Sequence, residues 1–350
     1  MQGAPGVSSR RAGPACLIPL ESIPSFTQVE ALTLAKQEYG VAGAVSTLPS
    51  ERDQNFLIVD GGGEKFVLKI ANTHDTPELL DFQNRAMRHV EESTPGCRVQ
   101  RVLSPLRGGD IVRVRQSGTG RDHCVRLLSW IDGEVLAKSA SRGPALFESV
   151  GAGLGKIDAA LCSFTHPAMH RVLQWDLRRA GMAREHARLL PQAKRAHVER
   201  IFSQWEGIDW AVLRHSVIHG DANDYNVIVG AGSMVGLLDF GDMVYSATVC
   251  ELAIALAYIM LGEDEPLDVA AQVTRAYQRH YPLREAERQA LYPLVLSRLA
   301  MSVCYSAHNR ARNPTDPYQV VSEAAAWNLL ETLDARPRHE VNGTWAAAAQ

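Results

Sequence analysis

The sequence predicts an α+β protein in which a small, strand-rich lobe precedes a larger helical lobe. In roughly the first 130 residues the apolar side chains fall in short β-rich runs, whereas from Gly143 onward they recur at helical spacing. Hydrophobic residues make up 46% of the 350, enough for a sizeable core. At about 150 residues per domain, the length allows two units. We therefore predict an N-terminal lobe over 22–129 and a helical lobe over 130–335, between a disordered leader (1–21) and a disordered tail (336–350).

The first lobe is predicted to hold several strands around one helix. Residues 55–59 and 65–70 are β-rich runs joined by a glycine turn, which indicates a hairpin. Residues 77–90 place apolar side chains at helical spacing and begin with a proline, which suits a first helical turn. Further short strands are predicted at 98–103, 111–115 and 124–128.

The second lobe is predicted to be built from long amphipathic helices, at roughly 144–163, 171–190, 247–262, 284–308 and 317–333. Three short apolar runs lie among them and are typical of buried strands, at 216–218, 227–229 and 235–238. No internal repeat is visible. The chemistry described next lies at the ends of these three runs.

Charge and composition exclude some classes of function. Lys and Arg number 36 against 39 for Asp and Glu, so the formal net charge is −3 and offers no excess of cations to a nucleic-acid backbone. The longest apolar run, 252–261, is about half of the ~20 residues that a membrane span needs. The six cysteines are scattered, as in proteins with reduced thiols. We expect a cytoplasmic protein that binds neither nucleic acid nor membrane; the first twenty residues, which lack acidic side chains, also allow a mitochondrial transit peptide.

The strongest functional signal is a pair of polar motifs bracketed by apolar strands. The first motif runs from His219 through Asp221 to Asn226, and the second contains Asp239 and Asp242. An Asp, an Asn five residues later and an Asp thirteen residues beyond that are the parts that phosphoryl transfer requires. One carboxylate orients the attacking hydroxyl, while an Asn and an Asp offer Mg²⁺ the oxygen ligands that it prefers. Each tripeptide alone is more typical of a turn between strands, but the two together at this spacing predict a kinase.

A cation for the nucleotide phosphates is available in the first lobe. Lys69 lies in an apolar strand whose side chains alternate between the two faces of the sheet, so it shares a face with Val67. A lysine there could also be an edge residue that extends to water. The downstream motifs favour phosphate binding.

These motifs resemble the catalytic and metal-binding motifs of the aminoglycoside phosphotransferase/choline kinase superfamily, within which the hydroxylysine kinases are the most similar family. The resemblance covers roughly residues 23–333. Besides the two motifs it is carried by residues 48–50, 53–56, 67–70, 83–84, 125–128 and 237–243.

The resemblance implies a protein-kinase-like bilobal fold that binds a nucleotide between the lobes and phosphorylates a hydroxyl of a small amine or amino acid. It implies Mg²⁺ as cofactor and GTP or ATP as donor; the hydroxylysine kinases imply GTP as donor and 5-hydroxy-L-lysine as acceptor. By the same resemblance, Asp221 matches the catalytic base and Lys69 the lysine on the α- and β-phosphates, while Asn226 and Asp239 match the Mg²⁺ ligands. Two further family positions, which support the catalytic loop, are matched by His219 and Asp242.

The sequence departs from the family pattern at two places near the nucleotide. The loop that would cover the phosphates, residues 50–55, has no glycine, so any phosphate contact there must use side chains or ordinary amides. The helix that normally supplies a Glu partner for the lysine offers Gln83 at the usual position and Asp81 as the charged candidate for orienting Lys69. The sequence does not choose between them.

The acceptor pocket is less well defined by the sequence. An amine substrate would be held by carboxylates and aromatic faces, for which the candidates are Asp224, Tyr225, Trp175, Asp176 and Glu251. Trp175 in the core and Glu251 as a buried hydrogen-bond acceptor are the competing interpretations. Two alternative functions stay open: a kinase of the same superfamily that acts on an aminoglycoside, homoserine or amino alcohol, and a catalytically silent kinase fold that serves as a binding module.

Overall fold

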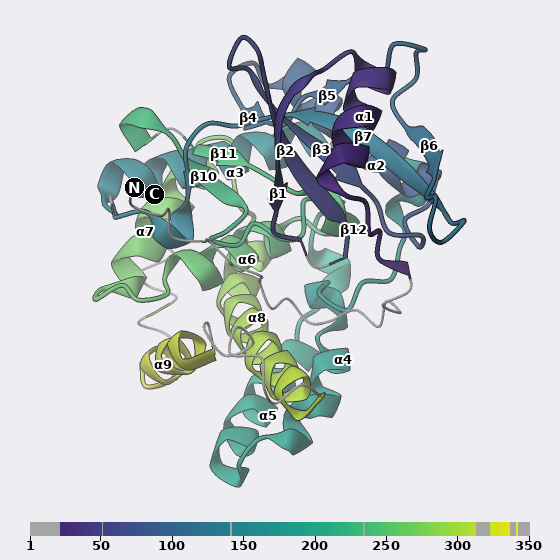
Figure 1. Ribbon diagram of the computed structural model, residues 1–350. Coiled ribbons are helices and arrows are strands. Elements are labelled where there is room, and N and C mark those ends of the chain that lie inside the picture. Colours follow the sequence, from purple (N-terminus) through teal and green to yellow (C-terminus); the bar gives the residue numbers. More distant parts are fainter. Residues whose placement is uncertain are drawn as a thin grey trace, which may run out of the picture.

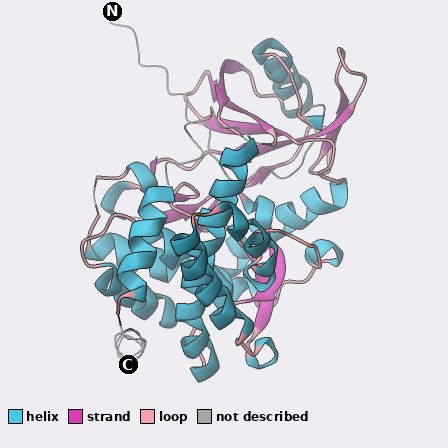
Figure 2. Ribbon diagram, turned by 90° about the horizontal axis from the view of Figure 1, so that it is seen from below, coloured by secondary structure: helices cyan, strands magenta, loops and turns pink. Residues whose placement is uncertain are grey.

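The computed structural model describes residues 22–50, 52–140, 142–233, 235–312, 323–336 and 341. The predicted leader, nearly all of the predicted tail and the start of the predicted helix at 317–333 lie outside the described residues. Within them, a strand-rich N-terminal lobe joins a helical C-terminal lobe, which confirms the predicted α+β class (Figure 1). Figure 2 shows most of the strands gathered at one end of the molecule and most of the helices at the other.

An antiparallel sheet of six strands forms the N-lobe, in the order β1-β2-β3-β7-β5 with β6 also paired to β7. Its strands are β1 (Gly43–Leu48), β2 (Gln54–Asp60), β3 (Lys65–Ile70), β5 (Val102–Leu103), β6 (Val112–Arg115) and β7 (Asp122–Ser129). The predicted hairpin is confirmed as β2 and β3, whose turn closes through Gly63, which has a φ of +84°. The sequence did not predict β1.

Two helices cover opposite faces of this sheet. Helix α1 (Gln28–Tyr39) begins at a Thr27 capping box and packs small side chains on one face. Helix α2 (Pro77–Ser93) confirms the predicted helix and packs on the other face, which also meets the C-lobe. Val67 belongs to this second core, and Lys69, two residues on, lies on the same face of the sheet as predicted. That face meets the C-lobe. The sequence missed α1 because its buried residues are mostly alanines, which give a weak apolar pattern.

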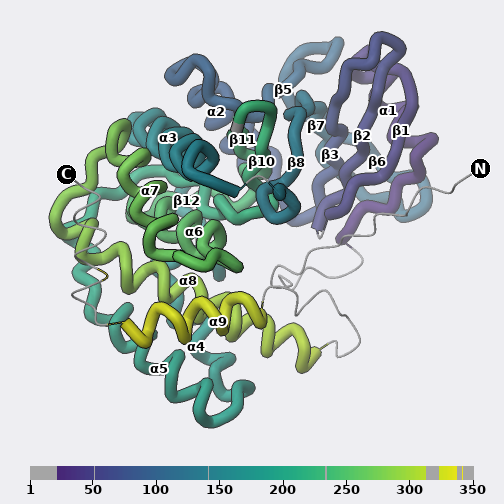
Figure 3. Tube along the Cα trace, turned by 90° about the vertical axis from the view of Figure 1, so that its left-hand side faces the viewer, coloured from purple at the N-terminus to yellow at the C-terminus, as the bar shows by residue number. Residues whose placement is uncertain are grey.

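A second sheet lies where the lobes meet (Figure 3) and has the order β4-β11-β10-β8. Its strands are β4 (Arg98–Val99), β8 (Glu134–Val135), β10 (Val227–Val229) and β11 (Val235–Leu237), and a separate pair joins β9 (His215–Ile218) to β12 (Val244–Ala247). The predicted strand at 98–103 is therefore wrong as one element. Its first part pairs in parallel with β11, and its last part pairs with β7 of the N-lobe.

The C-lobe consists of α3 (Pro144–Leu161), α4 (Gly181–Arg184), α5 (Gln192–Glu206), α6 (Val249–Ile259), α7 (Pro266–Gln278), α8 (Glu285–Arg312) and α9 (Glu323–Asp334). The single helix predicted over 171–190 is wrong. That segment holds the short 3₁₀ turns η4 (Leu177–Arg179) and η5 (Glu185–Leu189) around α4, because Asp176 caps η4 and Pro191 ends the run before α5. Helices α5 and α7 were not predicted.

Helix α8 runs through the core of the C-lobe. By length and composition alone it could cross a membrane, but 89% of its most apolar window of 18 residues is buried inside the protein, as in a core helix. Helices α3 and α7 approach closely because two glycines lack side chains at the contact: a Cβ on Gly151 would lie 2.1 Å from the carbonyl oxygen of Val273, and one on Gly155 would lie 2.4 Å from that of Tyr277.

Candidate active site

The loop from His219 to Asn226 joins β9 to β10, and buried contacts of His219 and Gly220 fix its position. His219 is fully buried; its Nε2 donates to the carbonyl oxygen of Leu238 at 2.8 Å, while its Nδ1 accepts from the amide of Asp221 at 3.3 Å. Gly220 has a φ of +80°, and a Cβ there would lie 2.5 Å from the carbonyl oxygen of Asp242. Only glycine fits this position, so the loop is pressed against the segment that follows β11. The histidine is placed to support the loop, in keeping with the sequence prediction.

Asp221 is held by three hydrogen bonds to its carboxylate. Oδ2 accepts from the side-chain amides of Asn223 and Asn226, each at 2.8 Å, and Oδ1 accepts from Nη2 of Arg298 at 3.0 Å. The side chain of Asp221 is 22% exposed. A carboxylate that is fixed on both oxygens yet reaches the surface is suited to orient an incoming hydroxyl.

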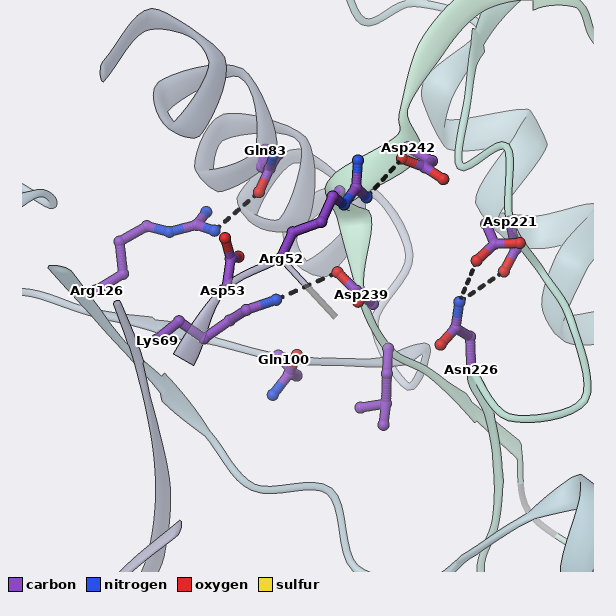
Figure 4. A network of polar contacts seen from close by, with 12 residues as sticks. Arg52, Asp53, Lys69, Gln83, Gln100, Arg126, Asp221, Asn226, Asp239 and Asp242 are labelled. Carbon is purple, nitrogen blue, oxygen red and sulfur yellow. Dashed lines mark hydrogen bonds and ion pairs between the residues drawn. The ribbon is translucent and has the colours of Figure 1, made fainter. Parts of the chain in front are cut away.

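Asp239 lies two residues after β11, where it adopts a left-handed conformation with a φ of +59°. It is the one non-glycine residue with positive φ in the described part of the chain, and such strain is typical of functional sites. Its Oδ1 accepts from Nζ of Lys69 at 3.2 Å, across the boundary between the lobes (Figure 4). The charge of Lys69, assisted by that of Arg52, lowers the pKa of Asp239 well below its usual value, so this carboxylate is ionised.

The two residues proposed for the metal, Asn226 and Asp239, offer oxygen donors of the kind that Mg²⁺ prefers. Asn226 donates its side-chain amide to the main-chain and side-chain oxygens of Asp221, which leaves its carbonyl oxygen for a cation (Figure 4). Asp239 adds an ionised carboxylate that is half exposed. The described residues contain no group of three or more His, Cys, Asp or Glu side chains that could hold a metal by themselves. Such a sparse set of oxygen donors suits Mg²⁺, which keeps several waters and is held largely by substrate phosphates.

Asp242 contacts the glycine-free loop of the N-lobe. Nη2 of Arg52 donates to Oδ1 of Asp242 at 3.0 Å, and Asp53 fixes the base of the same loop by accepting from the main-chain and side-chain amides of Asn72. The sequence had assigned Asp242 to loop support without a partner and had not singled out Arg52. The signal that could have found Arg52 is its position as the one cation among residues 50–55, the loop that the sequence analysis assigned to the phosphates.

Neither candidate from α2 orients Lys69, and this expectation needs correction. Oε1 of Gln83 accepts from Nη2 of Arg126 at 2.8 Å, and Asp81 pairs with Arg85 and His166. Arg126 stands directly opposite Lys69 in the pairing of β3 with β7, so both cations are on the same face of the sheet. The buried guanidinium of Arg126 donates hydrogen bonds to the neutral acceptors of α2, and Lys69 forms its ion pair with Asp239.

The acceptor-site candidates separate into buried and accessible groups. Glu251 is fully buried and its Oε2 accepts from the amide of Gly220 at 2.7 Å, while Asp176 caps η4 and accepts from the hydroxyl of Ser246 at 2.7 Å. Neither carboxylate is free to meet a substrate, so these two predictions are corrected to structural roles. Burial raises the pKa of Glu251, as expected for a carboxyl without solvent.

The other three candidates remain near the catalytic loop. Asp224 and Tyr225 lie within it and are partly exposed. Trp175 is half-buried and packs its ring against the guanidinium of Arg298, 4.3 Å from ring centroid to Cζ. Arg298 itself was missed by the sequence analysis; an arginine in the middle of an otherwise apolar helical run was the available signal.

The chain is similar to known phosphotransferases in sequence and in fold. Residues 44–290 match the model of a family described as "Phosphotransferase enzyme family". The chain is 28% identical to the hydroxylysine kinase of Mus musculus over 359 residues, which cover 93% of this chain and 94% of that protein. It is also 28% identical to the hydroxylysine kinase of Danio rerio over 351 residues, 94% of this chain and 98% of that protein.

Solved structures share the fold at lower identity. An amicoumacin kinase in complex with AMP-PNP, Ca²⁺ and Ami superposes with a TM-score of 0.70 at 14% identity, covering 90% of this chain and 97% of that one. The GDP complex of an aminoglycoside 2'-phosphotransferase gives a TM-score of 0.59 at 13% identity, covering 89% of this chain and 99% of that one. Both are similar to this chain in architecture.

Proposed function

Because the chain belongs to the phosphotransferase enzyme family, we propose that it transfers the γ-phosphate of ATP or GTP to a hydroxyl of a small amine, with 5-hydroxy-L-lysine as the acceptor. The observation that carries this proposal is the convergence of Asp221, Asn226, Asp239 and Lys69 at the interface between the lobes, from three segments: the loop between β9 and β10, the residues after β11, and β3 (Figure 4). An oriented carboxylate, two oxygen donors for a cation and an ammonium group are the parts that phosphoryl transfer uses.

In the proposed reaction each group has one task. The carboxylate of Asp221 accepts a hydrogen bond from the acceptor hydroxyl and aligns it for attack in line with the γ-phosphorus. Lys69, which pairs with Asp239 in this structure, neutralises charge on the nucleotide phosphates. Bound Mg²⁺, held by Asn226 and Asp239, would supply electrostatic stabilisation of the transferring phosphoryl group. Positioning and charge therefore provide most of the acceleration.

The choice of acceptor rests on similarity along the chain. The relatives named hydroxylysine kinase align over more than nine-tenths of this chain, so their acceptor is the first to test. The nucleotide is open to both purines: one related structure carries AMP-PNP and another GDP.

The experiment is a coupled phosphorylation assay across a panel of acceptors, each with ATP and with GTP in the presence of Mg²⁺. The panel contains 5-hydroxy-L-lysine, homoserine, amino alcohols and an aminoglycoside. Highest kcat/KM on hydroxylysine supports the proposal, whereas preference for another member assigns a different kinase of the same family. Binding of Mg-nucleotide without transfer to any acceptor identifies a catalytically silent binding module.

The variant Asp221→Asn tests the mechanism. It keeps the shape of the side chain but removes its charge, so we expect turnover to be lost, by about 10³-fold or more, while nucleotide binding stays close to wild type. Asp122→Asn is the matched control, because Asp122 forms an exposed ion pair with Arg115 at the far edge of the N-lobe sheet. Wild-type turnover in Asp221→Asn would end the assignment of this residue as the base.

A further inference from the structure

A charged partner of the Asp221 side chain comes from a distant helix. Nη2 of Arg298, in the middle of α8, lies 3.0 Å from Oδ1 of Asp221, and the two residues are 77 positions apart in the chain. The two asparagines on the other carboxylate oxygen belong to the same loop as Asp221 itself. Arg298 is therefore the contact that ties the orientation of this carboxylate to the body of the C-lobe.

The guanidinium of Arg298 is fixed in turn by its own surroundings. The residue is 1% exposed, and its guanidinium lies 4.3 Å from the ring centroid of Trp175 and 5.4 Å from that of Tyr258. Nη1 donates to the carbonyl oxygen of Trp175 at 3.1 Å. These aromatic rings and the carbonyl oxygen restrict both the position and the plane of the guanidinium. An arginine at the surface, surrounded by water, is not restricted in this way.

Placing a charge at this depth is costly. Burial by itself lowers the pKa of Arg298, but the neighbouring Tyr258 and Asp221 more than offset that effect and raise it, so the group is a cation. Its Nε is buried and lacks a hydrogen-bond partner, which adds to the cost of burying it. Replacing both members of a buried ion pair by apolar groups is often neutral or stabilising, so such a pair is weak evidence of a role in stability. The cost is explained if the cation serves catalysis rather than stability.

We propose that Arg298 is a positioning residue for phosphoryl transfer: clamped by Trp175, it fixes the carboxylate of Asp221 in the orientation that aligns the acceptor hydroxyl. The inference rests on the proposed function, since it gives Asp221 the role of the base. It also assigns a role to Trp175, the aromatic platform for the arginine. The described contacts of Arg298 are with Asp221, Trp175 and Tyr258, and none is with Lys69 or Asp239. Its effect is therefore expected on turnover and not on nucleotide binding.

The test compares Arg298→Met and Arg298→Lys with the wild-type protein, using the best acceptor of the panel. We expect Arg298→Met to lower kcat about 10²-fold, as a small misplacement of a catalytic group does, with the KM for nucleotide within about threefold of wild type. Arg298→Lys keeps the positive charge but lacks the planar guanidinium, so its kcat is expected to lie between that of Arg298→Met and that of the wild type. A merely structural role would not give this order of kcat at constant KM.

A matched control separates catalysis from stability. Arg214 forms another partly buried arginine–carboxylate pair with α8, with Nε 2.7 Å from Oε1 of the fully buried Glu287, about three helical turns before Arg298. We expect Arg214→Met to lower the melting temperature at least as much as Arg298→Met, and to leave kcat within about twofold of wild type. Equal loss of kcat in both variants would reduce the role of Arg298 to folding.

Two results would overturn the inference: wild-type kcat in Arg298→Met, or a rise in nucleotide KM without a fall in kcat. If Arg298→Met does not fold, Arg298→Lys and Trp175→Leu decide, because each leaves a cation at position 298 and disturbs only its geometry. Wild-type kcat in both of those variants would refute the proposal. Absence of transfer by the wild-type protein would instead refute the proposed function, so the two failures are distinguishable.

Discussion

Lys69 and Asp239 form an ion pair between the two lobes at the predicted phosphate site, and Lys69→Met tests its purpose. Methionine keeps the length of the side chain and removes the ammonium group. At 3.2 Å the gross attraction is about 5 kcal/mol for an effective dielectric constant of about 20. Because the side chain of Asp239 is 53% exposed, solvent screening and desolvation remove most of this energy, and we expect a net loss of at most about 1 kcal/mol in the free energy of unfolding.

The effect on catalysis is expected to be much larger. In the proposed nucleotide complex, the ammonium group of Lys69 would face phosphate charge, and the loss of one such contact costs about 3 kcal/mol of transition-state stabilisation. This corresponds to a fall of about 10²-fold in kcat/KM for the nucleotide. The assay is steady-state phosphorylation with varied nucleotide, run beside thermal unfolding of the same protein.

The same strand offers a matched control. Nζ of Lys65 lies 3.0 Å from Oδ1 of Asp132, but the two side chains are 43% and 78% exposed and lie outside the site. We expect Lys65→Met to keep kcat/KM within about twofold of wild type. The reasoning fails if Lys69→Met keeps kcat/KM within threefold of wild type, or if both variants lose activity equally.

Two further predictions concern Arg52 and Asp158. Arg52→Ala removes the ion pair with Asp242, in which the side chain of Arg52 is 37% exposed and that of Asp242 is 13% exposed. We expect the nucleotide KM to rise about five- to tenfold with little change in melting temperature. An unchanged KM would show that Arg52 does not contact the nucleotide. Burial, and then the charge of Glu251, raises the pKa of Asp158, which accepts a hydrogen bond from Tyr277. A buried carboxyl whose pKa is raised in the folded protein destabilises the fold increasingly as pH rises above its unfolded pKa of about 3.9. Asp158→Asn should therefore raise the melting temperature by about 2–4 °C at pH 8 and by less at pH 5, as thermal unfolding can measure. A lower melting temperature at both pH values would contradict this prediction.

Local pattern was sufficient for the elements that depend on near neighbours. The hairpin of β2 and β3, helix α2 and the strands on either side of the catalytic loop follow from alternation, helical spacing and glycine turns. The segment 171–190 failed because its apolar spacing was helical while Asp176 and Pro191 impose caps and a break. Helix α1 was missed for the opposite reason, since it buries mainly alanines.

The sequence by itself determined which groups are available for chemistry. Asp221, Asn226 and Asp239 stand at a fixed spacing around β10 and β11, and a hairpin with so short a turn keeps them together. Spacing along the chain is a local constraint, so the order and identity of these residues were sufficient to predict a phosphotransferase site.

Only the tertiary structure decided which cations meet these carboxylates. Lys69 and Asp239 are 170 positions apart, Arg52 and Asp242 are 190 apart, and Arg298 reaches Asp221 across 77. Periodicity and motif spacing do not encode such pairs, because they depend on how the lobes and α8 pack together. In that packing, Lys69 pairs with Asp239 rather than with a residue of α2, and the buried Arg298 lies beside the proposed base, Asp221.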